Sequence, residues 1–190
     1  MDAAWLTLYA SVRLVAKIAL RRGDRRYPLR SYVVGLAHQA VLLPTLLALG
    51  RVRAVYLSTF AYFLTDLVDT CEPFSLLFWH HVVSCLVIAA AQHIETPAVY
   101  AAGADITVAL EAGAIGLQLV ELAPGLGTRL FRLVWFAGSR VIAAEIGAEV
   151  IPAIRSTAIR RTVAACLVTL LAQNARQIFY YARSVLRCRP

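Results

Sequence analysis

Ionisable residues embedded in apolar segments are the part of this sequence that can do chemistry. His80 and His81 begin a long apolar run, and Ser84 follows them by one helical turn. Adjacent side chains on a helix point about 100° apart, so one imidazole can face a cavity while the other contacts a neighbour. A chelate from a single helix needs ligands three or four residues apart, so we expect no metal here. A neutral imidazole can instead act as a general base or accept an acyl group.

Carboxylates on the neighbouring segments complete a candidate catalytic set. Asp66 lies near the end of the apolar run that precedes the histidines, and Glu111 lies in the run that follows them. A charge in the middle of a membrane is costly and normally faces the interior of a helix bundle. Either carboxylate can therefore orient a histidine or balance its charge. The predicted catalytic residues are His80, His81, Asp66 and Glu111.

Further polar residues in the apolar runs form the predicted substrate-binding set. Asn174, Gln177 and Tyr181 recur at helical spacing and share one helix face. Such a stripe can line a site, or it can only link helices by hydrogen bonds. Arg140 can form an internal ion pair, although Glu145, five residues on, does not share its helix face. The full set predicted to bind substrate is Ser84, Asp105, Arg140, Asn174, Gln177 and Tyr181.

The composition of the chain indicates which elements must position these residues. Of its 190 residues, 60% are hydrophobic and 16% are charged, and the mean hydropathy is +0.68. Soluble domains carry about 45–50% apolar and about 25% charged residues, which excludes a water-soluble single-domain enzyme. A membrane-spanning helix takes about 20 residues. Apolar runs of about that length occupy residues 3–20, 32–49, 54–70, 74–93, 98–122, 130–151 and 163–182.

These runs predict an all-α fold, a polytopic transmembrane bundle of six core helices and an N-terminal seventh. We expect the core helices to surround a hydrophobic cavity that opens toward one membrane face. The first run contains Arg13 and Lys17, so it is either a span or an amphipathic helix in the interface, and we favour the span. Residues 1–30 then form an N-terminal helix with a basic loop, and residues 31–190 form the six-helix membrane domain.

The positive charge of the chain predicts its orientation. The net charge is +8 and the pI is about 9.8, but the arginines lie mostly in short segments between the apolar runs, so we expect no nucleic-acid partner. Ten arginines lie on the side of the 21–30 loop and the C-terminal tail, Arg129 and Arg132 among them, and five lie on the opposite side. The side richer in Lys and Arg normally faces the cytosol. The C-terminus is therefore predicted to be cytosolic.

Several motifs, taken in order, resemble the TLC-domain family, which includes ceramide synthases and the translocating-chain-associated membrane protein. Residues 62–67 (YFLTDL) precede a short turn and then residues 80–84 (HHVVS), with Glu111 in the next apolar run. Residues 135–140 (WFAGSR) are similar to the aromatic-plus-arginine segment of the family. Asn174 and residues 179–180 (FY) are similar to the asparagine and aromatic pair of its last helix. The resemblance covers about residues 30–185 and makes residues 31–190 a TLC-like domain.

The resemblance implies a function in lipid metabolism. In ceramide synthases the His-His motif belongs to the site that transfers an acyl group from acyl-CoA to a sphingoid base. Those enzymes carry a His-Asp-x-x-Asp motif where this chain has residues 107–111 (TVALE), so the first histidine and first aspartate are missing. The chain is more similar to small members of the family, to which lipid homeostasis, sensing or trafficking is attributed.

Three functions follow as hypotheses. The first is a multi-pass protein of the endoplasmic reticulum or another endomembrane that binds or regulates long-chain lipids. The second is an N-acyltransferase that takes acyl-CoA as co-substrate and a long-chain amine as acceptor. The third is a non-catalytic membrane scaffold whose buried polar residues only link helices. None of the three requires a bound cofactor, and the sequence leaves the oligomeric state open.

Overall fold

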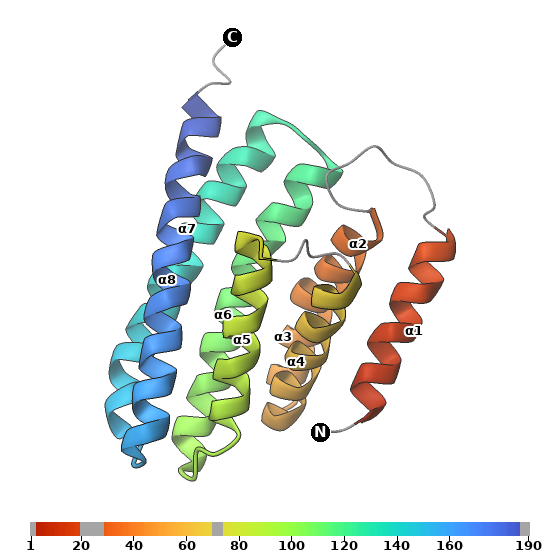
Figure 1. Ribbon diagram of the computed structural model, residues 1–190. Coiled ribbons are helices and arrows are strands. Elements are labelled where there is room, and N and C mark those ends of the chain that lie inside the picture. The colour runs from red at the N-terminus through yellow and green to blue at the C-terminus, as the bar shows by residue number, and fades with distance from the viewer. Residues whose placement is uncertain (1–2, 20–28, 70–73, 187–190) are drawn as a thin grey trace.

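The computed structural model describes residues 3–19, 29–69 and 74–186, and the fold of these residues is all-α. Its elements are α1 (Ala3–Ala19), α2 (Leu29–Ala37), the π-helical turn η1 (His38–Leu42), α3 (Leu43–Ala48), α4 (Val52–Asp69), α5 (Leu76–Ala91), α6 (Pro97–Leu122), α7 (Leu126–Val150), the 3₁₀ turn η2 (Ile151–Ala153) and α8 (Thr157–Leu186). Because α2, η1 and α3 follow one another without a break, the described residues form seven rods that run alternately up and down (Figure 1).

The observed helices coincide with the apolar runs, but α7 is longer at its start and α8 is longer at both ends. Helix α7 begins at Leu126, and α8 extends from Thr157 to Leu186, whereas the runs predicted 130 and 163–182. A criterion based on hydropathy places the boundary of a span at the first charged residue. Arginine, however, is a good helix former and does not end a helix. The extra turns therefore carry the charged ends of the two helices.

Two of the described helical segments are both long and apolar enough to cross a membrane. They are Ser31–Ala48 and Pro97–Leu122, while Ala3–Ala16 and Leu76–Ala91 are apolar but shorter. A buried helix of a soluble protein meets the same criterion of length and hydropathy. The criterion alone therefore does not decide the environment of the bundle.

Local signals in the sequence explain where several helices begin and end. The Ser75 side chain accepts a hydrogen bond from the Phe78 backbone N–H at 3.1 Å and caps α5. Pro97 occupies the first turn of α6, where its missing N–H costs nothing. Gly50 ends α3 with a φ of 66°, a left-handed conformation that glycine adopts without strain. These signals fix the loops at the lower end of the bundle and the upper end of α5.

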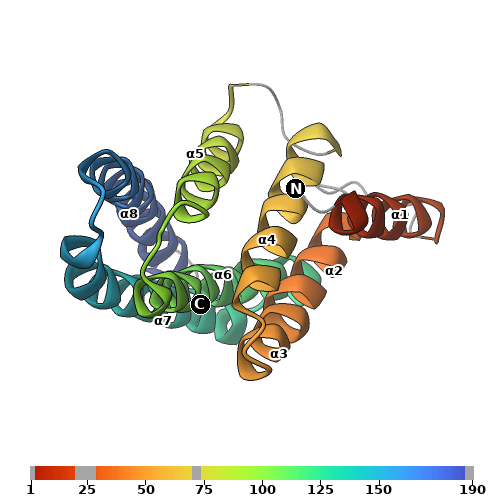
Figure 2. The ribbon, with the colours of Figure 1, turned by 90° about the horizontal axis from the view of Figure 1, so that it is seen from below.

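The helices pack in two layers with α1 outside them. Figure 2 shows α8, α5 and α4 in one layer, α7, α6 and the α2–α3 rod in the other, and α1 beside α4 and α2. Helix α1 lies upright alongside the bundle rather than across its end (Figure 1). Helix α1 therefore runs roughly parallel to the other rods.

The α6–α7 hairpin is held together at its glycines. A Cβ atom added at Gly116 would lie 2.7 Å from the Arg132 Cα, and one added at Gly113 would lie 2.0 Å from the Ser139 Oγ. Small residues let two helix backbones approach closely, as is common between membrane helices. The close approach fixes the position of α7 side chains relative to those of α6.

Candidate functional site

A cavity of about 610 Å³ lies between the two layers, and we call it the central cavity. Its lining is drawn from all the rods except α1. The residues are Ser31, Tyr32, Gln39, Tyr62, Phe63, Asp66, Ser75, Leu76, Leu77, His80, Glu111, Ala114, Leu117, Gln118, Glu121, Arg132, Phe136, Arg140, Asn174, Arg176, Gln177, Tyr180 and Tyr181. This volume is within the range of about 300–1,000 Å³ that small-molecule sites occupy.

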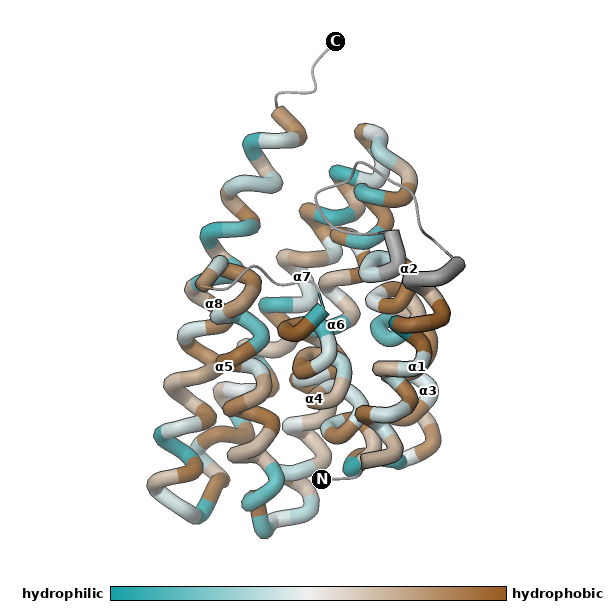
Figure 3. Tube along the Cα trace, turned by 45° about the vertical axis from the view of Figure 1, so that its right-hand side comes forward, coloured by the Kyte–Doolittle hydropathy of each residue, from teal (hydrophilic) through white to brown (hydrophobic). Residues whose placement is uncertain are grey.

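The central cavity lies toward one end of the bundle. Its lining includes residues near the start of α2, α5 and α7 and near the end of α6 and α8, and these helix ends all lie at the top of Figure 1. Hydrophilic residues recur in the upper parts of α6, α7 and α8 (Figure 3). The cavity expected from the sequence was hydrophobic, whereas the lining of this upper part combines ionisable and amide side chains with apolar ones.

Two smaller cavities continue the central cavity toward the other end of the bundle. The first, of about 30 Å³, is lined by Phe63, His80, Ser84, Val87, Ile88, Thr107, Leu110, Glu111, Arg140, Leu170 and Asn174. The second, of about 60 Å³, shares Val87, Ile88, Leu110 and Leu170 with it and is otherwise lined almost entirely by apolar residues such as Val99, Ile151 and Leu167. Polarity therefore falls continuously along the bundle, from a polar chamber to an apolar end.

Most of the predicted site residues meet in this series of cavities. Asp66, His80, Glu111, Arg140, Asn174, Gln177 and Tyr181 line the central cavity, and Ser84 lines the smaller cavity next to it. Asp105 does not join them, because its side chain is exposed and lines none of these cavities. Six residues turn a helix by about 600°, which places Asp105 on a different face of α6 from Glu111, so the structure does not bring it together with the other predicted site residues.

The two histidines have different surroundings. His80 is half-buried and lines the central cavity. His81 is buried, and its Nδ1 lies 3.4 Å from Asp66 Oδ2. Phe63 lies between the layers here and packs against both rings. The geometry leaves His80 able to meet a ligand and assigns His81 to contacts within the protein.

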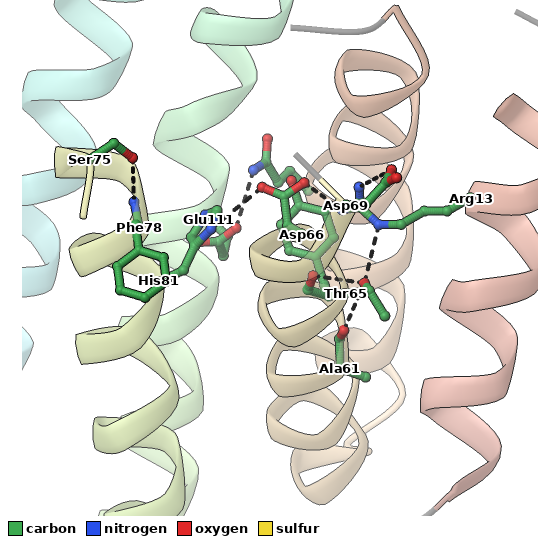
Figure 4. A network of polar contacts seen from close by, with 11 residues as sticks. Arg13, Ala61, Thr65, Asp66, Asp69, Ser75, Phe78, His81 and Glu111 are labelled. Carbon is green, nitrogen blue, oxygen red and sulfur yellow. Dashed lines mark hydrogen bonds and ion pairs between the residues drawn. The ribbon is translucent and has the colours of Figure 1, made fainter. Parts of the chain in front are cut away.

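Asp66 is the centre of a polar network that joins α4 to α1 and α5 (Figure 4). Its Oδ1 accepts a hydrogen bond from Arg13 Nη2 at 2.7 Å, and Arg13 Nε donates to Thr65 Oγ1 at 3.1 Å. Arg13 Nη1 also lies 3.6 Å from Asp69 Oδ2. In the sequence, Arg13 interrupts the first apolar run. A guanidinium inside such a run needs a partner on another helix, and this was the signal for its pairing with α4.

A second polar cluster consists of Tyr9, His38 and Gln39, and the sequence had not singled out Tyr9 or Gln39 as site residues. The hydroxyl of Tyr9 contacts His38 Nδ1, and the His38 ring stacks on Tyr62 at 4.4 Å between centroids. Gln39 Nε2 donates to Glu111 Oε2 at 3.2 Å. His38 and Gln39 belong to the π-helical turn η1, and both are buried. Such turns replace regular helix where side chains serve a site, and Pro44, which lacks an N–H, follows just after it.

Two arginines of α7 line the central cavity with little exposure, 8% for Arg132 and 7% for Arg140. Arg132 was counted in the sequence as a loop charge, and that placement is wrong, because α7 begins six residues earlier. The Arg132 guanidinium stacks on Tyr181 at 4.1 Å and donates to Ser184 Oγ. The Arg140 guanidinium lies 3.7 Å from the Phe136 centroid. No described carboxylate forms an ion pair with either of them.

Several buried polar atoms of the cavity lining have no hydrogen-bond partner among the described residues. They are Ser31 Oγ, Gln39 Oε1, Arg132 Nε, Arg140 Nε and Asn174 Oδ1. A buried polar group without a partner costs about 1–3 kcal/mol, so native proteins rarely keep several together. Their concentration around one cavity is the expected property of a site for a polar group.

Comparisons of the chain with protein-family models, with curated proteins and with solved structures find no match. The resemblance to the TLC-domain family therefore rests on the sequence motifs alone.

Proposed function

We propose that this chain is a multi-pass membrane protein whose central cavity binds a long-chain lipid, as a component of lipid homeostasis, sensing or trafficking. The observation that carries the proposal is the change in polarity along the cavities. Ionisable and amide groups surround the wide upper chamber, and apolar side chains surround the narrow end. A molecule that matches both ends has a polar head and a hydrocarbon chain. Chain burial contributes about 0.8 kcal/mol per methylene.

The distribution of side chains supports placement in a membrane. The buried residues include charged and amide groups, Asp66, Glu111, Arg140 and Asn174 among them, while large apolar residues such as Val134, Val141 and Val168 are exposed. Soluble monomers rarely expose large contiguous apolar surface. Polar residues inside and apolar residues outside are the arrangement that lipid favours.

The arginine distribution supports an orientation. The upper end of the bundle carries the helix ends next to the 21–30 loop and the end of α8. Without Arg132, which is buried in α7, this side has nine of the counted arginines against five on the other side. By the rule that positive loops stay inside, the mouth of the central cavity faces the cytosol. The endoplasmic reticulum or another endomembrane is the compartment that the family resemblance favours.

A variant that fills the central cavity tests lipid binding. Ala114 lines the cavity, and Ala114→Trp places an indole within it; Ala172→Trp, at an exposed position of α8, is the matched control. Protein purified in mild detergent and examined by native mass spectrometry is expected to carry a lipid in the wild type and in Ala172→Trp. We expect occupancy at least tenfold lower in Ala114→Trp. Equal occupancy in all three proteins would contradict the proposal.

One observation favours the N-acyltransferase as a second candidate: His80 faces the cavity beside Glu111 and Asn174. Loss of a general base typically lowers a rate by about 10²–10⁴-fold. His80→Ala should therefore abolish transfer from a labelled acyl-CoA to a long-chain amine, with exposed His93→Ala as control. His81→Ala should have a smaller effect, because that ring contacts Asp66 instead of the cavity. Absence of wild-type turnover across a range of chain lengths would remove this candidate.

A further inference from the structure

Opposite charges are held apart inside the cavity, although they lie on neighbouring helices. Glu111 of α6 is buried, and the carboxylate accepts a hydrogen bond from Gln39 but forms no ion pair with a described cation. Arg140 of α7 lines the same two cavities as Glu111 and forms no ion pair with a described carboxylate. In a low-dielectric site, two such groups attract each other strongly. Their separation needs an explanation.

The contacts of Arg140 show what holds it away from Glu111. Its Nη1 donates to the Leu110 carbonyl at 2.6 Å and to Ser139 Oγ at 2.8 Å. The guanidinium also lies over the Phe136 ring, and its buried Nε has no hydrogen-bond partner among the described residues. Both charges are thus fixed by other groups before any ligand arrives. A site with a fixed cation and a fixed anion is preorganised for a molecule that carries both signs.

We infer that Glu111 and Arg140 bind a zwitterionic lipid head group, with the phosphate on Arg140 and a primary ammonium on Glu111. The inference rests on the proposed function and names the lipid class, an aminophospholipid. Guanidinium groups match phosphate oxygens in geometry and charge. A primary ammonium has three donors, and the acceptor that the site provides is the carboxylate of Glu111, a residue that lines both cavities. The apolar end of the cavity series receives an acyl chain.

The test compares head groups on identical dioleoyl chains. The wild type in neutral detergent is titrated with phosphatidylethanolamine, phosphatidylcholine, phosphatidylglycerol and diacylglycerol. Phosphatidylcholine keeps the charge but lacks the ammonium donors, phosphatidylglycerol lacks the cation, and diacylglycerol lacks both charged groups. Loss of one hydrogen bond to a charged group raises the Kd by about tenfold to hundredfold. We expect phosphatidylethanolamine to bind at least tenfold more tightly than each of the other three.

Two variants separate the roles of the two charges. Arg140→Gln should weaken binding of phosphatidylethanolamine and of phosphatidylglycerol, at least tenfold each. Glu111→Gln should weaken phosphatidylethanolamine by a similar factor and leave phosphatidylglycerol unchanged. Arg129→Gln and Glu145→Gln are the controls for net charge, because neither residue lines the cavity. If a variant fails to fold, the wild-type ranking of head groups alone decides the inference.

The outcomes distinguish this inference from the proposed function. Equal affinity for the four lipids, unchanged by the variants, would overturn the head-group assignment while lipid binding stands. Tightest binding of phosphatidylglycerol would overturn the role of Glu111 as an ammonium site. Binding of none of the lipids, or equal competition by soluble phosphoethanolamine, would overturn the proposed function as well.

Discussion

The protein buries two sets of opposite charges and treats them differently. At the α1–α4 contact, Arg13 and Asp66 form an ion pair of 2.7 Å, and both side chains are at least nine-tenths buried. At the α6–α7 contact, Glu111 and Arg140 are buried to a similar degree but are not paired. The first set joins two helices. The second set leaves its charges available to the central cavity.

The difference teaches that burial of a charge does not by itself indicate a functional site. An ion pair whose members satisfy each other is a structural contact, and removal of one member leaves the other uncompensated. A buried charge that is held by neutral groups has no such dependence on an opposite charge. Such a charge is a candidate for contact with a ligand.

The largest effect is expected for Asp66→Leu, which removes the buried carboxylate that pairs with Arg13 and leaves only the more distant and more exposed Asp69. Breaking a buried pair on one side costs about 3–5 kcal/mol, so the free energy of unfolding should fall by that amount. The double variant Arg13→Met with Asp66→Leu should recover most of the loss, because neither member of the buried pair remains. Unfolding by SDS titration in mixed micelles measures both. A double variant as unstable as the single one would show that the pair does not act as a unit.

The position of each helix was predictable from the apolar runs, because a run of about 20 apolar residues has few alternatives to a helix. The site was predictable in part. Helical spacing alone brought Asn174, Gln177 and Tyr181 onto one face, and all three line the cavity. Asp105 lies six residues from Glu111, and this spacing places it on a different face of the helix from Glu111.

The partners of Asp66 were not predictable in the same way. Arg13 is far from Asp66 in the chain, and their contact depends on how α1 packs against α4. The sequence offered Asp66 as a catalytic residue, whereas the structure gives it a pairing role as well as a place at the cavity. Gln39 likewise reaches Glu111 through a π-helical turn, which hydropathy patterns do not report. Tertiary packing decides such contacts, and one sequence does not encode them in its periodicity.

An intermediate effect is expected at the α6–α7 contact, which fixes the second set of charges. Gly116→Val places a side chain against the Arg132 backbone, where even a Cβ would lie 2.7 Å from Cα. Overpacking of this kind costs about 1–3 kcal/mol, and the shift of α7 should also weaken lipid binding. Gly138→Ala on α7 is the control, because no heavy atom lies within 4 Å of its added Cβ. Equal unfolding free energies for the two variants would show that the helices do not need this close approach.

The smallest effect on stability is expected from Arg140→Met, and its comparison with the same substitution at Arg13 is the sharpest test of the difference between the two sets of charges. Arg13→Met and Arg140→Met each remove a guanidinium that is no more than 7% exposed. Arg13→Met removes the guanidinium that lies 2.7 Å from the buried Asp66 carboxylate, so it should lose about 3–5 kcal/mol. Arg140→Met removes a charge that has no carboxylate partner, so the free energy of unfolding should stay within about 1 kcal/mol of the wild type or rise.

The measurement needs lipid-free protein, because a ligand that binds only the folded state stabilises it and would add its own loss to the Arg140→Met value. In the presence of the lipid, Arg140→Met should then lose the additional stabilisation that the wild type gains. If Arg140→Met is as unstable as Arg13→Met without lipid, Arg140 is a structural charge like Arg13. The distinction between the paired and the separated charges would then fail, since both sets would be serving the fold.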